Sequence, residues 1–175
     1  MTSEERVNPS IRSIVVMGVA GSGKSTVARA LATRLDYGFI DADSLHSPEN
    51  IAKMTAGHPL DDDDRYPWLH AVGRRVESDT VDQHGTVTAC SALKRAYRDV
   101  LRLYVPDAFF VYLDGSFEVV KARIETRPHE IISESLLGSQ FAILEPLGED
   151  ERGTRVDIRF SPEAIVDDVA AQLAP

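Results

Sequence analysis

The sequence predicts an α/β protein in which a five-stranded parallel sheet is covered by helices on both faces, in three layers. Two observations predict this fold. Short, β-branched apolar runs alternate along the chain with longer segments of helical periodicity, which indicates parallel strands joined by crossover helices. The first apolar run, residues 11–17, leads directly into a glycine-rich segment and a helical pattern. Ligands of such sheets bind beyond the carboxyl ends of the strands.

The predicted strands are short, mostly apolar and bounded by turn residues. They cover residues 11–17, 37–41, 85–90, 108–113 and 155–158. The helices between them are marked by start and stop signals, such as the Ser-Pro pairs at 47–48 and 161–162 and the break at Pro128. The expected helices cover residues 24–35, 48–57, 65–81, 93–103, 117–127 and 133–144, with a last one from 162 onward.

Composition limits the classes of function. The chain has 175 residues and a formal net charge of −9, which argues against nucleic acid or an anionic membrane as a partner. Residues 1–10 predict a flexible polar tail without a signal-peptide core, and residues 11–175 a single domain. The single cysteine, Cys90, follows an apolar run and is expected to be buried. We therefore expect a cytoplasmic protein.

Residues 18–25 read Gly-Val-Ala-Gly-Ser-Gly-Lys-Ser and match the phosphate-binding P-loop pattern G-x-x-x-x-G-K-S/T in full. Backbone N–H groups of such a loop and the following helix N-terminus bind phosphates. Lys24 is expected to reach the β- and γ-phosphates of ATP, and the Ser25 hydroxyl to bind Mg²⁺. The predicted nucleotide-binding residues are Gly18, Ala20, Gly21, Ser22, Gly23, Lys24, Ser25 and Thr26.

A GTPase switch is the first alternative to a kinase. The chain has no N-K-x-D motif for guanine, and the D-x-x-G match at residues 82–85 follows a polar segment instead of an apolar strand. A nucleotide-gated binding module is therefore disfavoured.

Asp41 and Asp43 end the second predicted strand, at the edge where ligands bind. One carboxylate can hold the water shell of Mg²⁺, and the other can accept or orient the proton of an attacking hydroxyl. The alternative is that the pair only caps the following turn.

Basic residues recur at helical spacing in two places. Lys94, Arg98 and Arg102 share one face of a helix, where they could hold a substrate carboxylate. Arg123 and Arg127 also share a face, and they could close over a triphosphate and neutralise charge on the transferring phosphoryl group. Solvated basic stripes are the alternative for both sets.

Other polar residues favour structural roles. Asp61 to Asp63 of the acidic run at residues 61–64 are expected to be solvated, whereas Asp64 could pair with Arg65 or cap the next helix. His46 and His58 lack the spacing of a zinc site. Trp68 is expected in the core or at an interface.

Several longer segments are similar to the gluconokinases, relatives of shikimate kinase and the nucleoside monophosphate kinases. The resemblance covers roughly residues 13–171, and its most specific segments lie outside the P-loop. These are Asp41-Ala-Asp-Ser-Leu-His46, Asn50-Ile-Ala-Lys-Met54, Gly57-His-Pro-Leu60, Asp62-Asp-Asp-Arg65, Pro67-Trp-Leu69, Cys90-Ser-Ala-Leu-Lys94, Tyr97-Arg-Asp99, Ser139-Gln-Phe141 and Leu144-Glu-Pro-Leu147.

The resemblance implies a P-loop NTPase fold of the nucleoside-monophosphate-kinase type with a mobile helical lid at about residues 121–145. It implies transfer of the γ-phosphoryl group of ATP, with Mg²⁺, to the 6-hydroxyl of D-gluconate by a homodimer. The implied catalytic residues are Lys24, Asp43, Arg123 and Arg127. The implied acceptor-binding residues are Asp43, His46, Lys53, Arg65, Lys94 and Arg98.

One position departs from the family pattern: Glu130 stands where the lid of relatives carries a histidine. A carboxylate there would repel an acidic substrate. A kinase for another sugar acid or polyol, or a degenerate nucleotide-binding regulatory protein, is therefore the alternative function.

Overall fold

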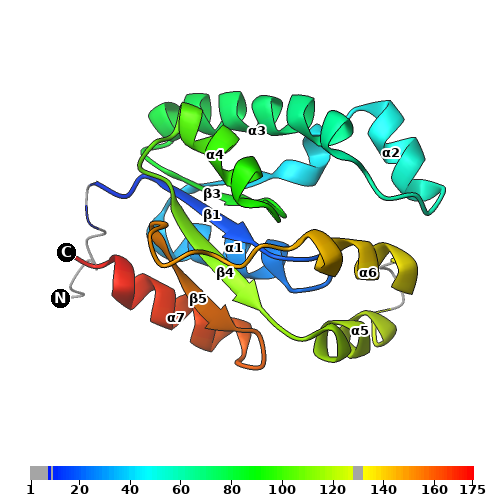
Figure 1. The fold of residues 1–175 in the computed structure, drawn as a ribbon. Helices are drawn as coiled ribbons and strands as arrows, with labels where there is room; N and C mark the ends of the chain where they lie inside the picture. Colours follow the sequence, from blue (N-terminus) through cyan, green and yellow to red (C-terminus); the bar gives the residue numbers. More distant parts are fainter. Residues whose placement is uncertain (1–7, 9, 128–131) are drawn as a thin grey trace.

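The sheet is parallel throughout and has the strand order β2-β3-β1-β4-β5 in a computed structural model that describes residues 8, 10–127 and 132–175 (Figure 1). The strands are short, as the apolar runs predict. Their bounds are β1 Ser13–Met17, β2 Gly38–Asp41, β3 Thr86–Ala89, β4 Phe109–Asp114 and β5 Gly153–Asp157. The predicted α/β fold with five parallel strands is confirmed.

Helices cover both faces of the sheet. On one face α1 (Lys24–Leu35) packs against α7 (Pro162–Leu173), and on the other α3 (Asp62–Asp82) packs against α4 (Arg95–Tyr104). The remaining helical segments are η1, a 3-10 turn at Ala42–Leu45, α2 Pro48–Thr55, α5 Phe117–Glu125 and α6 Glu134–Ile143. In Figure 1, α2, α5 and α6 lie at the end of the molecule opposite the C-terminus.

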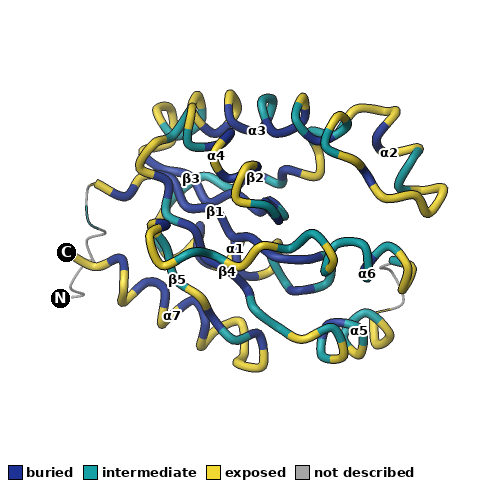
Figure 2. The backbone as a smooth tube through the Cα atoms, viewed as in Figure 1, coloured by how far each residue is buried: buried dark blue, intermediate teal, exposed yellow. Residues whose placement is uncertain are grey.

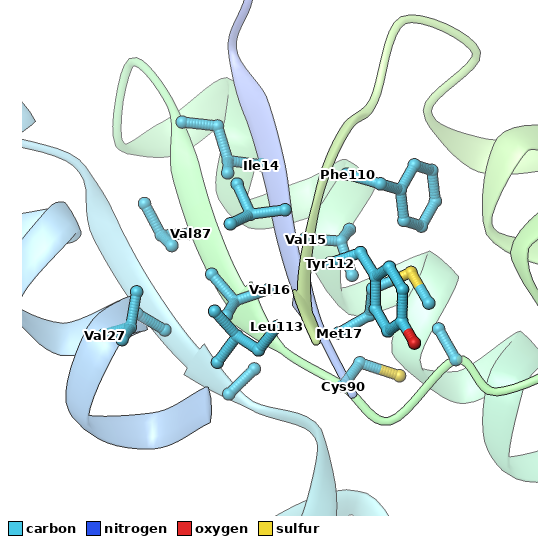
Figure 3. Packing of buried hydrophobic residues seen from close by; sticks show 14 of the residues in the cluster. Ile14, Val15, Val16, Met17, Val27, Val87, Cys90, Phe110, Tyr112 and Leu113 are labelled. Carbon is cyan, nitrogen blue, oxygen red and sulfur yellow. The ribbon is translucent and has the colours of Figure 1, made fainter. Parts of the chain in front are cut away.

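The core follows from the position of β1 in the middle of the sheet. All five residues of β1 are buried, and Val16 is paired with Ala89 of β3 on one side and Val111 of β4 on the other. Side chains of β1, β3 and β4 and of the segments that follow them form the packing shown in Figure 3, where Cys90 lies beside Met17. The predicted burial of Cys90 is confirmed, and burial raises the pKa of its thiol to about 12.

Helix α3 begins at Asp62, three residues earlier than the sequence pattern predicts, which corrects the expected loop at 58–64. The cause is a capping box: the Asp61 carboxylate accepts from Asp64 N–H at 2.9 Å, and the Asp64 carboxylate accepts from Asp61 N–H at 2.9 Å. The acidic run is therefore a helix start, where negative charge is favourable. Strand β5 also begins two residues before the predicted position, at Gly153.

The helices beyond the sheet are less buried than the strands. Figure 2 shows β1 and β3 as mostly buried, whereas α2, α5 and α6 carry many intermediate and exposed residues. Helices α5 and α6 lie within or next to the predicted lid range, and the departure at Glu130 lies outside the described residues. None of the helices in the described ranges combines the length and the apolar character of a membrane span.

Candidate active site

The loop between β1 and α1 has the backbone that phosphate binding needs. Gly18, Gly21 and Gly23 have φ angles of 151°, 77° and 98°, which residues with a Cβ atom rarely adopt. Gly23 is the N-cap of α1 and supplies no side chain to cap the helix, and the first turn holds no acidic residue. The first N–H groups of α1 can therefore bind an anion.

A cleft of about 480 Å³ opens at this loop and extends to the opposite wall formed by η1, α2 and α3. It brings most of the predicted site residues together. Those that line it are Ala20, Gly21, Gly23, Lys24, Ser25, Thr26, Asp43, His46, Arg65 and Arg127. Trp68, Met54, Ser91 and Gln140 line it as well. One cleft therefore has a phosphate-binding side and a polar side suited to an acceptor.

Two side chains hold the P-loop from within the cleft. Lys24 Nζ donates to the Val19 carbonyl oxygen at 2.9 Å. The Gln140 Oε1 atom, from α6, accepts from Ala20 N–H at 2.7 Å. Gln140 was not among the predicted site residues, although a polar side chain within the apolar helix α6 is a signal for such a contact. Helix α6 therefore reaches the P-loop directly.

The residues predicted to hold Mg²⁺ suit a cation that keeps most of its water ligands. The Ser25 side chain lies in the first turn of α1 and lines the cleft. Asp41 lies at the carboxyl end of β2, and its Oδ1 atom accepts from Asp43 N–H at 3.0 Å. Asp41 thus also caps the turn η1, so the two roles weighed for the D-x-D pair are compatible. Among the described residues, no group of three or more His, Cys, Asp or Glu side chains forms a metal site.

Asp43 and His46 line the side of the cleft opposite the P-loop, which we call the acceptor wall after its predicted role. The Asp43 side chain is 73% exposed, whereas the His46 side chain is 4% exposed, and Asp43 Oδ1 lies 3.8 Å from His46 Nε2. The imidazole stacks on the Trp68 ring with a centroid distance of 4.1 Å and an interplanar angle of 15°. Burial lowers the pKa of His46 more than the Asp43 carboxylate raises it, so the ring is neutral at neutral pH.

Arg65 supplies a positive charge to the floor of the cleft. The residue is only 7% exposed, and its Nη1 atom donates to the Tyr97 hydroxyl at 3.3 Å. The Tyr97 hydroxyl donates in turn to Asp62, which also accepts from Lys94 Nζ at 3.1 Å. Lys94 lines a neighbouring depression that shares Arg65 with the cleft. Lys94 therefore lies beside the cleft and is connected to Arg65 through Asp62 and Tyr97.

Lys53 and Arg98 do not line the cleft. Lys53 Nζ lies 2.5 Å from Asp64 Oδ2 in the capping box of α3. The Arg98 side chain is 0% exposed and donates to both carboxylate oxygens of Glu151, at 2.7 Å and 2.8 Å. It also donates to backbone carbonyls of the segments after β3 and after α6, including Ala92 at 2.9 Å. Arg98 was predicted to bind the acceptor, but the structure places its side chain in the core, away from the cleft.

The two predicted lid arginines take different positions. Arg127 lines the cleft. Arg123, on α5, donates to the Ile158 carbonyl oxygen in the connection between β5 and α7. Arg127 therefore lies at the cleft and Arg123 lies near the end of β5, so the two side chains do not form one cluster in this structure.

Comparison with known proteins identifies the family. The family model for shikimate kinase matches residues 20–140. The gluconokinase of Gluconobacter oxydans (strain 621H) is 42% identical over 90% of this chain and 89% of its own length. The thermoresistant gluconokinase of Escherichia coli (strain K12) is 42% identical over 87% of each chain.

Two solved structures of kinases are also similar to this chain. A gluconokinase from Sinorhizobium meliloti 1021 superposes with a TM-score of 0.87 at 46% identity, over 96% of this chain and 93% of that one. A sugar kinase from Janibacter sp. HTCC2649 gives a TM-score of 0.85 at 44% identity, over 94% and 99%. The chain therefore belongs to the gluconokinase family.

Proposed function

We propose that the protein transfers the γ-phosphoryl group of ATP to the 6-hydroxyl of D-gluconate, giving 6-phospho-D-gluconate and ADP. The observation that carries the proposal is the single cleft that joins the P-loop to Asp43, His46 and Arg65. Arg65 offers positive charge for a small acid, and Asp43 offers an exposed carboxylate for its hydroxyl. The names of the curated relatives support gluconate as that acid.

The residues suggest in-line transfer without a covalent enzyme intermediate. Asp43 accepts the hydroxyl proton as the new O–P bond forms, while the bond between the γ-phosphorus and the β–γ bridging oxygen breaks and ADP leaves. Lys24, Arg127 and, in this proposal, Arg123 neutralise the charge on the transferring group. Mg²⁺, when held by Ser25 and through water by Asp41, adds charge neutralisation at the β- and γ-phosphates. The homodimer that the family resemblance implies and the cytoplasmic location that the composition predicts are part of the same proposal.

A coupled ADP-release assay with Mg·ATP and an acceptor panel tests the function. The panel contains D-gluconate, other aldonates, shikimate and nucleoside monophosphates. We expect saturable turnover with gluconate and only background ADP release with the other acceptors. Turnover with another acid would retain a kinase and reassign the acceptor. ATP binding without turnover for any acceptor would contradict the proposal.

A further inference from the structure

Three polar side chains form a line from the interior to the cleft: Asn50, His46 and Asp43. Asn50 lies on α2 and is 7% exposed. Its Nδ2 atom lies 3.4 Å from His46 Nδ1, and His46 Nε2 lies 3.8 Å from Asp43 Oδ1. Because only the Asp43 side chain is well exposed, the line connects a buried amide to the acceptor wall.

A second contact determines which atom of the Asn50 amide faces His46. The same Nδ2 atom donates to the Asp64 carbonyl oxygen at 3.0 Å. A carbonyl oxygen only accepts hydrogen bonds, so the atom between Asp64 and His46 is the amide nitrogen, which has two hydrogens and accepts none. The second hydrogen therefore serves His46 Nδ1, and this ring nitrogen is the acceptor.

The ring of His46 is consequently held in one tautomer. A neutral imidazole carries one N–H group, so an accepting Nδ1 leaves the proton on Nε2. Stacking on Trp68 fixes the ring plane, and the Trp68 indole N–H donates to the Ala42 carbonyl oxygen at 2.8 Å. The charged groups that influence His46 are Asp41, Asp43 and Arg65.

We propose that Asn50 is a positioning residue that holds His46 as the Nε2–H tautomer, so that the acceptor wall presents a hydrogen-bond donor beside Asp43. This inference rests on the proposed function. A protonated Nε2 has no lone pair for the proton of the acceptor hydroxyl, so of these two side chains only Asp43 can take that proton. His46 instead donates to the Asp43 carboxylate or to an acceptor oxygen and orients it.

Nitrogen NMR of the uniformly ¹⁵N-labelled protein tests the tautomer directly. His46→Gln assigns the ring signals. We expect a protonated Nε2 and an unprotonated Nδ1 in the wild type. Asn50→Asp replaces the donor with a carboxylate that only accepts, so the proton should move to Nδ1. A wild-type ring protonated at Nδ1, or a ring unchanged by Asn50→Asp, would overturn the proposal, and neither outcome depends on the acceptor.

The other asparagine of the chain, Asn8, provides a matched control for the substitution Asn50→Asp. Ser10 N and Ser10 Oγ both donate to the Asn8 Oδ1 atom, so the carboxylate of Asn8→Asp keeps these contacts far from the cleft. Asn8→Asp should leave the His46 signals and the activity unchanged. It controls for the added negative charge.

Kinetics then separate positioning from packing. Asn50→Asp should lower kcat/KM for gluconate roughly ten- to a hundredfold, the effect of removing one partner of a buried hydrogen bond, with little change in KM for ATP. Glutamine at position 46 carries an amide N–H without tautomers, so Asn50→Asp should cost much less in the His46→Gln background. An equal cost in both backgrounds would overturn the proposal.

If Asn50→Asp lowers the melting temperature strongly, Asn50→Ala provides the same comparison. If the wild type prefers another acid of the panel, that acid replaces gluconate.

Discussion

Asp43 is the exposed member of a wall whose other side chains are buried. Its carboxylate is 73% exposed, while its neighbour His46 is stacked on Trp68 with only 4% of the side chain exposed. An exposed carboxylate held by a rigid turn is free to meet the hydroxyl of an acceptor. A residue with this placement contributes to rate more than to binding of the nucleotide.

Asp43→Asn should therefore lower kcat about a hundredfold or more, because an amide cannot accept the hydroxyl proton, and should leave KM for ATP nearly unchanged. Steady-state kinetics with varied Mg·ATP and gluconate measure both constants. The matched control is Asp36→Asn, at the exposed C-cap of α1, where Asn also tolerates the φ angle of 55°. Near-normal kcat in Asp43→Asn would remove Asp43 as the proton acceptor.

The positions of residues could be predicted where a sequence motif determines the backbone, and could not where the prediction used only the charge and spacing of side chains. Six of the eight residues predicted from the P-loop pattern line the phosphate side of the cleft, whereas Gly18 and Ser22 are buried and do not line it. Lys94, Arg98 and Arg102 were predicted to share one helical face, yet Arg98 is completely buried and paired with Glu151. Helical spacing places side chains on one face, but it does not reveal an acidic partner far along the chain.

The start of helix α3 involves five side chains, two of them from distant parts of the chain. Asp61 and Asp64 close the capping box, and Lys53 and Lys94 pair with Asp64 and Asp62 in the same turn. The helix carries Arg65 and Trp68 into the cleft, where Trp68 stacks on His46. An acidic run reads as a solvated loop in the sequence because capping depends on backbone geometry that composition does not specify.

Asp61→Ala should reduce the free energy of unfolding by about 1 kcal/mol, the usual cost of losing an N-cap side chain. Urea unfolding followed by circular dichroism measures the change. Asp63→Ala is the control, because Asp63 is exposed in the same turn and lies outside the capping box. Equal effects of the two variants would show that only the negative charge near the helix start matters.

Across the whole molecule, one buried ion pair joins parts that are distant in sequence. Arg98 and Arg102 of α4 both contact Glu151, and Arg98 also binds backbone carbonyls at Ala92 and Glu145. The segment after β3 and the segment after α6 are thereby held together. Burial alone would raise the pKa of Glu151, but hydrogen bonds from Arg98, Arg102 and the Gly148 N–H lower it to about 2.

The lowered pKa of Glu151 predicts acid sensitivity. The ordinary pKa of 4.5 falls to about 2 in the folded protein, so the unfolded chain binds the proton more readily between these values. The resulting stability, on the order of 3 kcal/mol, is present above pH 4.5 and is lost as the pH falls toward 2. The difference in unfolding free energy between the wild type and Glu151→Gln, measured in urea, should shrink below pH 4.5. A constant difference down to pH 3 would contradict this assignment.

The alternation of apolar runs with helical segments was sufficient to predict the sheet, because parallel strands need crossover helices between them. It was insufficient for the contact between Gln140 of α6 and Ala20, which depends on how α6 returns over the P-loop. The predicted lid motion and the effect of Glu130 stay predictions.

The central place of β1 has a consequence for synthesis. Ser13 is paired with Thr86 and Ile14 with Phe109, and Gly18 N–H donates to the Ser91 carbonyl oxygen at 3.2 Å. A chain leaving the ribosome therefore carries the apolar strand β1 without a neighbour until β3 has been made, and without its second neighbour until β4 has been made. Pairings so distant in sequence form slowly and leave apolar surface exposed. The nascent chain, more than the finished enzyme, is the species that needs protection from aggregation.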